Sequence, residues 1–228
     1  MAVPILLAWS GGKDSALTLA ALNADPAWDV VGLLTMTGAD DGRISIHGIP
    51  RAVLLAQAAA AGLPVIAAPL PANPANGTYE GAMAAALAEA QGRWPGLRHI
   101  AFGDLFLADV RAYRERTLAP LGWQPVFPLW GRDTAELAHA FIAQGFRAVL
   151  TCVDTTQIPA DFAGRAYDDA LLADLPASAD PCGEKGEFHT CTHAGPVFAA
   201  PLGLTVGARH RRDGRFEMAE VALAVAAG

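Results

Sequence analysis

The feature that most constrains the fold is an alternation of short apolar runs with helical segments over the first half of the chain. The apolar runs cover residues 3–9, 30–36, 64–68 and 98–103, and the helical segments cover residues 14–23, 50–61, 79–91 and 108–118. A continuous apolar run is typical of a strand that is covered on both faces, as strands of parallel sheets are. The alternation therefore predicts an α/β fold in which βα units build a parallel, Rossmann-like sheet.

The second half of the chain changes character and predicts a smaller α+β domain. We expect strands over residues 124–127 and 146–153, a helix from Asp133 or Thr134 to residue 144, and a closing hairpin of residues 202–210 and 216–225 turned at Asp213 and Gly214. Residues 180–196 are polar, contain three glycines and show little periodicity, which is typical of a functional loop. The two domains are predicted to cover residues 1–123 and 124–228.

Composition and charge exclude several classes of protein. Hydrophobic residues make up 53% of the 228 residues and charged residues 17%, which allows a buried core without disulfide or metal staples. The net charge of -7 argues against a nucleic-acid partner, because affinity for a phosphate backbone comes from clustered Lys and Arg. The one dense basic run, residues 209–212, is interpreted as the solvated rim of the hairpin.

Hydropathy and cysteine content predict a cytoplasmic protein. No apolar run approaches the roughly 20 residues that cross a bilayer, and the first ten residues lack the basic start of a signal peptide. Cys152, Cys182 and Cys191 are an odd number of cysteines without a CxxC motif, which indicates free thiols in a reducing compartment. We therefore expect no membrane partner, and the sequence leaves a homodimer open.

The turn of residues 10–15, Ser-Gly-Gly-Lys-Asp-Ser, carries the clearest chemistry. It lies between the first apolar run and the first helix, which is the edge of a parallel sheet where ligands bind. Gly11 and Gly12 let the backbone approach an anion closely. The N-terminus of the following helix offers free amides and the positive end of its dipole, so the turn is predicted to bind phosphate.

The side chains of this turn fit the same interpretation. Lys13 adds a positive charge, and Ser10 and Ser15 add hydroxyl donors. Asp14 indicates Mg²⁺, because its carboxylate would repel phosphate unless a cation lay between them. The turn is not a Walker A loop, since that pattern would require a glycine at Leu7 and a Ser or Thr at Asp14.

The turn resembles the pyrophosphate-binding loop of the PP-loop ATP pyrophosphatases, which cleave ATP between its α and β phosphates. Further segments, in order from residue 10 to 196, are similar to the bacterial branch of the diphthine–ammonia ligase family. These segments are His47-Gly48, Tyr79-Glu80, Phe102-Gly103-Asp104, Arg111, Pro128-Leu129-Trp130, Gly145-Phe146-Arg147-Ala148, Asp180-Pro181-Cys182, Gly183-Glu184-Lys185-Gly186-Glu187-Phe188-His189-Thr190 and Cys191-Thr192-His193.

The resemblance implies a fold, two cofactors and three sets of site residues. The fold is an adenine nucleotide alpha hydrolase-like domain, and the cofactors are ATP and Mg²⁺, with Asp14 as the metal ligand. The implied ATP ligands are Ser10, Gly11, Gly12, Lys13, Asp14, Ser15, Gly103 and Asp104; the implied catalytic groups are Lys13, Glu184, Glu187 and His189; and the implied substrate-binding residues are His47, Tyr79, Glu80 and Arg111. Archaeal and eukaryotic members amidate diphthine on elongation factor 2, and the bacterial features imply the same chemistry on another acceptor.

Several of these residues have a simpler alternative role. Asp104 either holds a metal or ribose or caps the next helix, and Arg111 either stabilises the leaving pyrophosphate or forms a surface ion pair. His47 is either a base or a loop cap. Because polar residues that follow parallel strands share one edge, the residues expected to converge there also include Arg132, Asp133 and Asp154.

The cysteines and histidines of the polar loop raise the alternative of a metal site. Cys182, Glu184, His189, Cys191 and His193 are all zinc-ligand types, but their spacing matches no standard finger, so zinc is the lesser alternative. A nucleophilic Cys182 or Cys191 would need a lowered pKa and has no base placed by the sequence.

The expected function is an ATP-dependent carbon–nitrogen ligase. A carboxylate of a metabolite or a protein attacks the α-phosphate, pyrophosphate leaves, and ammonia displaces AMP to give an amide. Free ammonia is the expected nitrogen source, because no glutaminase signature is apparent. One alternative is an ATP- or AMP-binding sensor, against which the two carboxylates and the histidine of residues 183–190 argue. The other is a PP-loop tRNA-modifying enzyme, against which the acidic charge and the missing CxxC argue.

Overall fold

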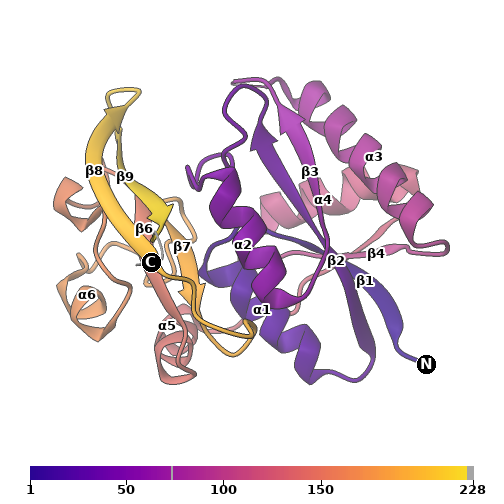
Figure 1. Cartoon of the computed structure of the whole chain (residues 1–228), viewed down its shortest axis with the longest axis horizontal. Coiled ribbons are helices and arrows are strands. Elements are labelled where there is room, and N and C mark those ends of the chain that lie inside the picture. The colour runs from indigo at the N-terminus through magenta and orange to yellow at the C-terminus, as the bar shows by residue number, and fades with distance from the viewer. Residues whose placement is uncertain (73, 225–228) are drawn as a thin grey trace.

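Two sheets lie side by side in the computed structural model, which describes residues 1–72 and 74–224 (Figure 1). The first sheet has five strands, all parallel, in the order β3-β2-β1-β4-β5. Its strands are β1 (Val3–Ala8), β2 (Trp28–Gly38), β3 (Val65–Leu70), β4 (His99–Ala101) and β5 (Gln124–Val126). The predicted parallel sheet and α/β class are confirmed.

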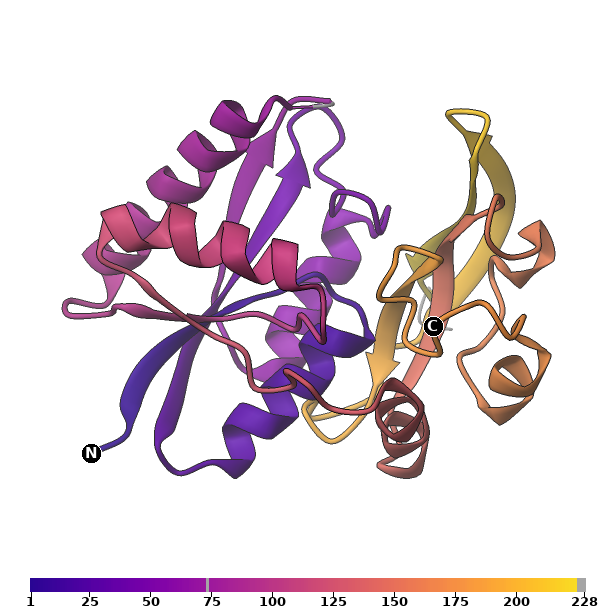
Figure 2. The ribbon, with the colours of Figure 1, turned by 180° about the vertical axis from the view of Figure 1, so that it is seen from behind.

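Helices cover both faces of this sheet. They are α1 (Lys13–Ala24), α2 (Arg51–Ala61), α3 (Asn76–Arg93) and α4 (Ala108–Leu118), followed by the 3-10 turn η1 (Ala119–Leu121). Helices α1 and α2 lie in front of the sheet in Figure 1, and α3 and α4 lie in front of it in Figure 2. Successive side chains of a strand point to opposite faces, so Ile5 and Leu7 join the core under α1 and α2 while Leu6 joins the core under α3. This two-sided burial explains why β1 is apolar throughout.

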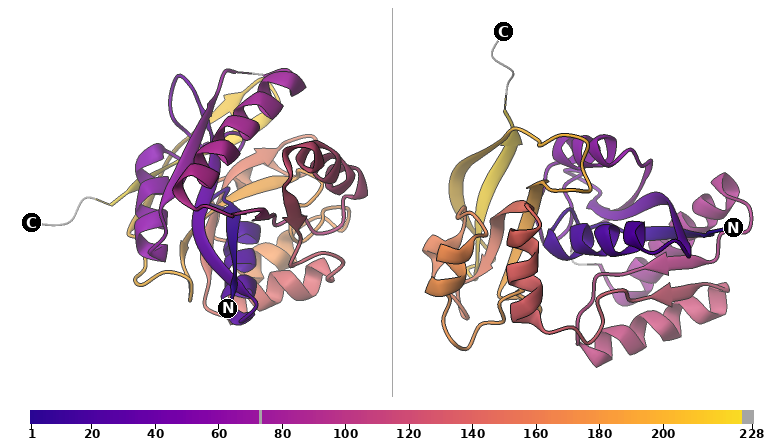
Figure 3. Two further views of the ribbon diagram at one scale, coloured as in Figure 1. Left: turned by 90° about the vertical axis from the view of Figure 1, so that its right-hand side faces the viewer. Right: turned by 90° about the horizontal axis from the view of Figure 1, so that it is seen from below.

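The second sheet is antiparallel, with strand order β7-β6-β9-β8. Its strands are β6 (Arg147–Asp154), β7 (Phe188–Ala194), β8 (Leu204–Arg212) and β9 (Phe216–Leu223), and its helical segments are α5 (Thr134–Ala143), η2 (Ala160–Phe162) and α6 (Asp169–Asp174). The views of Figure 3 show this unit beside the parallel sheet, with β7 the strand on the side of α1.

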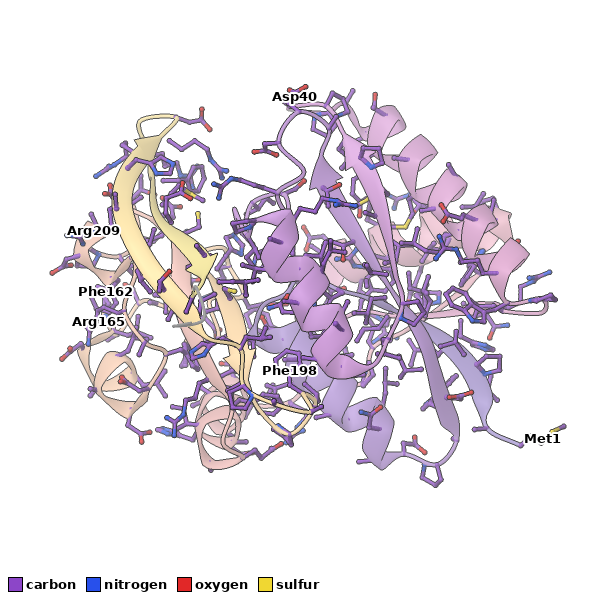
Figure 4. The ribbon with its side chains drawn as sticks, viewed as in Figure 1. Met1, Asp40, Phe162, Arg165, Phe198 and Arg209 are labelled. Atoms are coloured by element: carbon purple, nitrogen blue, oxygen red, sulfur yellow. The ribbon has the colours of Figure 1, made fainter. Side chains whose placement is uncertain are left out.

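One hydrophobic core runs through both units. It includes Leu17 and Leu54 from the helices of the parallel sheet and Val149 and Cys191 from the antiparallel sheet. The labelled Phe198 lies between the two units in Figure 4, and its ring meets the ring of Trp9 edge-on at 6.3 Å. The units are therefore packed on each other through apolar side chains rather than joined by a linker alone.

The helix boundaries follow the predicted caps. Pro50 precedes α2 and Gly62 ends it in the left-handed conformation, with a φ of 68°. Asp133 caps α5 by accepting a hydrogen bond from the backbone amide of Glu136, as predicted. None of the described helices is long and apolar enough to cross a membrane.

Three predictions about the second half are wrong in part. Strand β5 pairs with β4, so the parallel sheet extends past the boundary proposed after residue 123. The polar stretch 180–196 is not structureless, because β7 occupies Phe188–Ala194. Helix α6 was not predicted. Asp154 ends a strand of the antiparallel sheet and does not share the ligand-binding edge. The hairpin is confirmed up to residue 223; Val225 lies outside the described residues.

Candidate functional site

A cavity of about 500 Å³ lies at the carboxyl edge of the parallel sheet. Its lining includes the ends of β1 and β2, the residues after β4, and the segment before and within β7, so both units contribute to it. The volume falls in the range of small-molecule sites, and the edge is the one at which α/β sheets bind ligands. The predicted site residues that line it are Ser10, Lys13, Asp14, Ser15, His47, Tyr79, Gly103, Asp104, Glu184 and His189.

The 10–15 turn depends on glycine. Gly11 has a φ of 75°, and a Cβ there would lie 2.7 Å from Oε1 of Gln57 and 2.9 Å from Cδ1 of Ile49. A Cβ on Gly12 would lie 2.8 Å from Cε1 of His47. These close approaches leave no space for a side chain at either position.

Strand β7 holds the turn from the other side. The backbone amide of Lys13 donates to Oγ1 of Thr190 at 3.0 Å, and the amide of Thr192 donates to the carbonyl of Gly11 at 2.8 Å. Gln57 donates from Nε2 to the carbonyls of Gly11 and Thr192 at 2.9 and 2.7 Å. The shape of the turn is thus fixed by Gln57 of α2 and by strand β7, which lies about 180 positions away in the sequence.

The N-terminus of α1 keeps donors for an anion. Gly12 caps it without a side-chain hydrogen bond, and the first amide, of Lys13, is already taken by Thr190. Within the described part of the chain, the backbone amides of Asp14 and Ser15 donate to no acceptor. The hydroxyl of Ser15 donates to the carbonyl of Gly12 at 2.9 Å and faces the cavity. The hydroxyl of Ser10 donates to Oγ of Ser15 at 3.3 Å, so both serine hydroxyls are engaged within the turn and the two amides are the donors available to a phosphate.

Lys13 is a buried cation paired with its neighbour. Its side chain is 2% exposed, and Nζ lies 5.9 and 5.8 Å from the ring centroids of Tyr167 and Phe188. Nζ donates to both carboxylate oxygens of Asp14, at 2.6 and 2.8 Å. Burial lowers the pKa of Lys13, but the adjacent carboxylate of Asp14 is the main influence that raises it, and the net shift is upward, so Lys13 stays charged.

This pairing changes the argument for a metal. Asp14 already has the ammonium of Lys13 as its counter-charge, so its negative charge does not by itself require Mg²⁺. Over residues 1–72 and 74–224, the structure brings together no cluster of three His, Cys, Asp or Glu side chains that could hold a metal ion, so the five zinc-ligand types of the polar loop do not form one. Mg²⁺ commonly takes one or two carboxylates and completes its shell with phosphates and water, and Asp14 fits that limited role.

The residues after β4 provide a second ion pair. Arg114 donates from Nη2 to Oδ1 of Asp104 at 3.0 Å and from Nε to Oδ2, and its guanidinium lies 4.1 Å from the centroid of Phe102. Asp104 does not cap α4, whose cap residue is Leu107. Burial lowers the pKa of Arg114, but Asp104 raises it by more, so the Arg114 guanidinium stays charged at the cavity wall.

Arg114 was missed by the sequence analysis, which chose Arg111 from the same helix. Arg111 pairs with Glu115 at 2.8 Å, and its guanidinium lies over the rings of Phe127 and Trp130. Arg111 does not line the cavity, and its surface ion pair is the simpler of the two predicted roles. Position 114 lies about one helical turn after position 111 on α4, and this spacing is the sequence signal that could have indicated Arg114.

Glu184 connects the two units at the cavity. Its Oε1 accepts a hydrogen bond from the amide of Leu105 at 2.8 Å. Burial raises the pKa of the Glu184 carboxyl to about 7; the amide of Leu105 opposes the shift, and the charges of Asp14 and Asp104 add to it. A carboxyl with a pKa near neutrality can exchange a proton at physiological pH.

Glu187 has a different position from the one predicted. It is 1% exposed and accepts from the amides of Asp180 at 2.8 Å and Lys185 at 3.0 Å. Its carboxylate therefore shapes the 180–187 segment and does not line the cavity. Similarly, Glu80 accepts from the hydroxyl of Tyr113 at 3.1 Å in a smaller adjoining pocket, outside the main cavity.

Two neutral histidines line the same cavity as Glu184. The ring centroids of His47 and His189 are 4.8 Å apart. Nδ1 of His47 lies 2.9 Å from the carbonyl of Thr190, and because a carbonyl only accepts, Nδ1 carries the proton and Nε2 is left as an acceptor. Burial lowers the pKa of both rings, for His189 well below its usual value with help from His47 and Lys13.

The cysteines are not activated. Burial raises the pKa of Cys182 and of Cys191 to about 12 and that of Cys152 to about 11, so all three are thiols at neutral pH. The three are free and buried. This disfavours a cysteine nucleophile in the cavity.

The comparisons with known proteins identify no family. A scan against protein-family models finds no match for this chain, and a search of curated proteins finds none of significant similarity. The geometry described above is therefore the ground for assigning a function.

Proposed function

We propose that this chain is an ATP-dependent amide ligase related to the diphthine–ammonia ligases, on an adenine nucleotide alpha hydrolase-like scaffold. The observation that supports this most is one shared cavity. The preformed 10–15 turn opens into the same space as Glu184, His47 and His189. A phosphate site and a set of proton-transferring groups at one cavity suit a reaction in which phosphate chemistry activates a second substrate.

The phosphate end would hold the triphosphate through neutral donors. The amides of Asp14 and Ser15 would bind the oxygens, and the hydroxyls of Ser10 and Ser15 would join them by turning from their partners within the turn. Lys13 would stabilise the charge that grows on the leaving pyrophosphate. Mg²⁺ bound with the nucleotide at Asp14 would neutralise part of the phosphate charge. The cavity is also lined by Leu34, Met36 and other apolar side chains, which suit a nucleobase.

The chemistry would proceed in two displacements. An oxygen of the acceptor carboxylate attacks the α-phosphorus, the bond to the β-phosphate oxygen breaks, and pyrophosphate leaves with that electron pair. The nitrogen of ammonia then attacks the acyl carbon, the bond to the phosphate oxygen of AMP breaks, and the nitrogen loses a proton. Glu184 in its ionised form or the neutral His189 would accept that proton.

The sensor alternative has one supporting observation. Both cavity cations, Lys13 and Arg114, are already paired with carboxylates, as they would be in a site that only exchanges nucleotides. The proton-exchanging Glu184 in the same cavity as two neutral histidines favours the ligase, because a sensor has no need for such a group.

The test is an isotope-exchange assay that needs no ammonia. Purified protein is incubated with ATP, Mg²⁺, labelled pyrophosphate and a small-molecule fraction of a cell extract. Adenylation is reversible, so label should enter ATP only when the acceptor is present, and added ammonium should then yield AMP and pyrophosphate in equal amounts. Formation of ADP and phosphate would refute the proposal, and tight ATP binding without exchange for any small-molecule or protein fraction would favour the sensor.

The chain offers a matched pair of lysine variants, since Lys13 and Lys185 are its only lysines. Lys13→Met should lower exchange at least 100-fold, because it removes the cation beside the leaving group. Lys185→Met should retain wild-type exchange, because that side chain is exposed and does not line the cavity. Circular dichroism and unfolding curves of both variants separate loss of catalysis from loss of folding.

A further inference from the structure

The segment between β2 and α2 contains a strained turn at the cavity. The amide of His47 donates to the carbonyl of Ser45 at 2.8 Å, which closes a three-residue γ-turn around Ile46. Ile46 has a φ of 66°. The γ-turn with a positive φ is rare and strained, and a β-branched side chain makes it more so, because its Cβ substituents crowd the backbone in this conformation.

The surrounding residues hold this turn in place. The amide of Ile44 donates to the carbonyl of Ile49 at 2.8 Å, and the amide of Gly48 donates to the carbonyl of Ile44 at 2.9 Å. Ile44 and Ile49 are buried at 3% and 0% exposure. Arg43 donates from Nη1 to the carbonyl of Gly48 at 2.7 Å and from Nη2 to Glu220 of β9 at 2.8 Å. Both ends of the turn are therefore fixed while its tip is strained.

The tip itself is exposed. The Ile46 side chain is 55% exposed and lines the large cavity. An exposed apolar side chain gains nothing from the fold, so neither packing nor solvation explains why an isoleucine stands where Asn or Gly would be free of strain. Strained residues that the structure holds rigidly are concentrated at ligand contacts, where the strain fixes a side chain in its binding position.

We infer that Ile46 is a preformed clamp on the nucleobase of the bound nucleotide. The amide of Ser45 donates to the carbonyl of Met36 at the end of β2 at 3.3 Å, so the turn adjoins the apolar end of the cavity that Leu34 and Met36 line. Bound there, a flat heteroaromatic ring would cover the exposed face of Ile46 and bury it. This inference rests on the proposed function, because it takes ATP as the ligand.

The test compares three substitutions at position 46 by ATP binding, in the absence of acceptor, and by thermal unfolding of the free protein. Ile46→Asn removes the β-branch and tolerates a positive φ better than isoleucine, so it should raise the Tm of the free protein by about 2–4 °C. It should also weaken ATP binding about tenfold, because the apolar contact with the base is lost. Ile46→Gly should weaken binding at least as much. Ile46→Val keeps both the strain and the apolar contact and should stay within threefold of wild type in affinity, with an unchanged Tm.

The outcomes separate this inference from the proposed function. Wild type that binds ATP together with an Ile46→Asn variant that binds it within twofold would overturn the clamp and leave the ligase proposal standing. A lower Tm for Ile46→Asn would show that position 46 is not strained and would also overturn the clamp. Wild type that fails to bind ATP would overturn both proposals.

Discussion

Glu184 gives the most demanding test of the site, because its ionisation should destabilise the fold. Burial raises its pKa from 4.5 to about 7, so the folded state holds a proton that the unfolded chain has lost between these two values. Where the native state binds more protons, stability falls as pH rises. The free energy of unfolding of the wild type should therefore fall between about pH 4.5 and about pH 7, and it should reach its lower value above pH 7.

The magnitude follows from the same interval. It spans about 2.5 pH units at about 1.4 kcal/mol each, which gives a limit of about 3.5 kcal/mol, reduced to about 2 kcal/mol because the carboxyl is partly exposed. Glu184→Gln keeps an oxygen acceptor for the amide of Leu105 and cannot ionise. The variant should match the wild type at pH 4.5 and exceed its free energy of unfolding by about 2 kcal/mol at pH 8.

Urea unfolding of both proteins from pH 4.5 to pH 8 measures this difference directly, and effects of all other titrating groups cancel in the subtraction. A difference that stays constant within about 0.5 kcal/mol over this range would refute the raised pKa. If Glu184 also accepts the proton from ammonia, the variant should gain stability while losing at least 100-fold in amide formation. A stable variant with full activity would indicate that His189, and not Glu184, accepts the proton from ammonia.

Three further substitutions test other contacts. Thr190→Val removes the acceptor of the Lys13 amide while keeping the shape, so it should lower the free energy of unfolding by about 1–3 kcal/mol, whereas Thr190→Ser should lose less than about 1 kcal/mol; equal losses would deny the hydroxyl this role. Asp154→Asn should cost about 1–3 kcal/mol at pH 7, because Asp154 is buried and pairs with Arg215. This pairing holds the pKa of Asp154 well below its usual range, so the difference from wild type should shrink as pH falls below about 4, as urea unfolding at pH 7 and pH 3 would show. Gly81→Ala, in open space on α3, should stabilise the protein by about 0.5–1 kcal/mol in the same assay, and a loss would show that α3 needs the glycine.

The parallel sheet could be predicted because its strands are apolar on both faces. Ile5, Leu6 and Leu7 are each fully buried although they alternate between two cores. The apolar run alone therefore predicts a buried strand, whichever elements pack against it. The helix caps at Gly62 and Asp133 could be predicted for the same local reason, since backbone conformation and capping depend on a few adjacent residues.

Strand β7 could not be predicted because two of its buried side chains are polar and interrupt the apolar pattern of Phe188, Cys191 and Ala194. Thr190 and Thr192 are 2% and 0% exposed, yet threonine in a glycine-rich stretch is typical of a loop. Thr190 is buried because its hydroxyl accepts from Lys13, a contact between distant parts of the chain that no local pattern contains. Asp154 was misplaced for a related reason: the sequence does not show that β6 leaves the parallel sheet, and the shared-edge argument fails in an antiparallel one.

The charges of the cavity explain why the backbone, more than the lysine, would recognise the phosphates. Lys13 is held by Asp14 and Arg114 by Asp104, so each cation enters the site already neutralised. A triphosphate brought into such a site meets no excess positive charge, and the remaining attraction comes from the amides of α1 and from whatever cation accompanies the nucleotide. Binding of ATP should therefore depend strongly on Mg²⁺, while AMP, which carries less charge, should bind almost equally with and without it. Equal Mg²⁺ dependence for the two nucleotides would show that one of the ion pairs opens and frees its cation for phosphate.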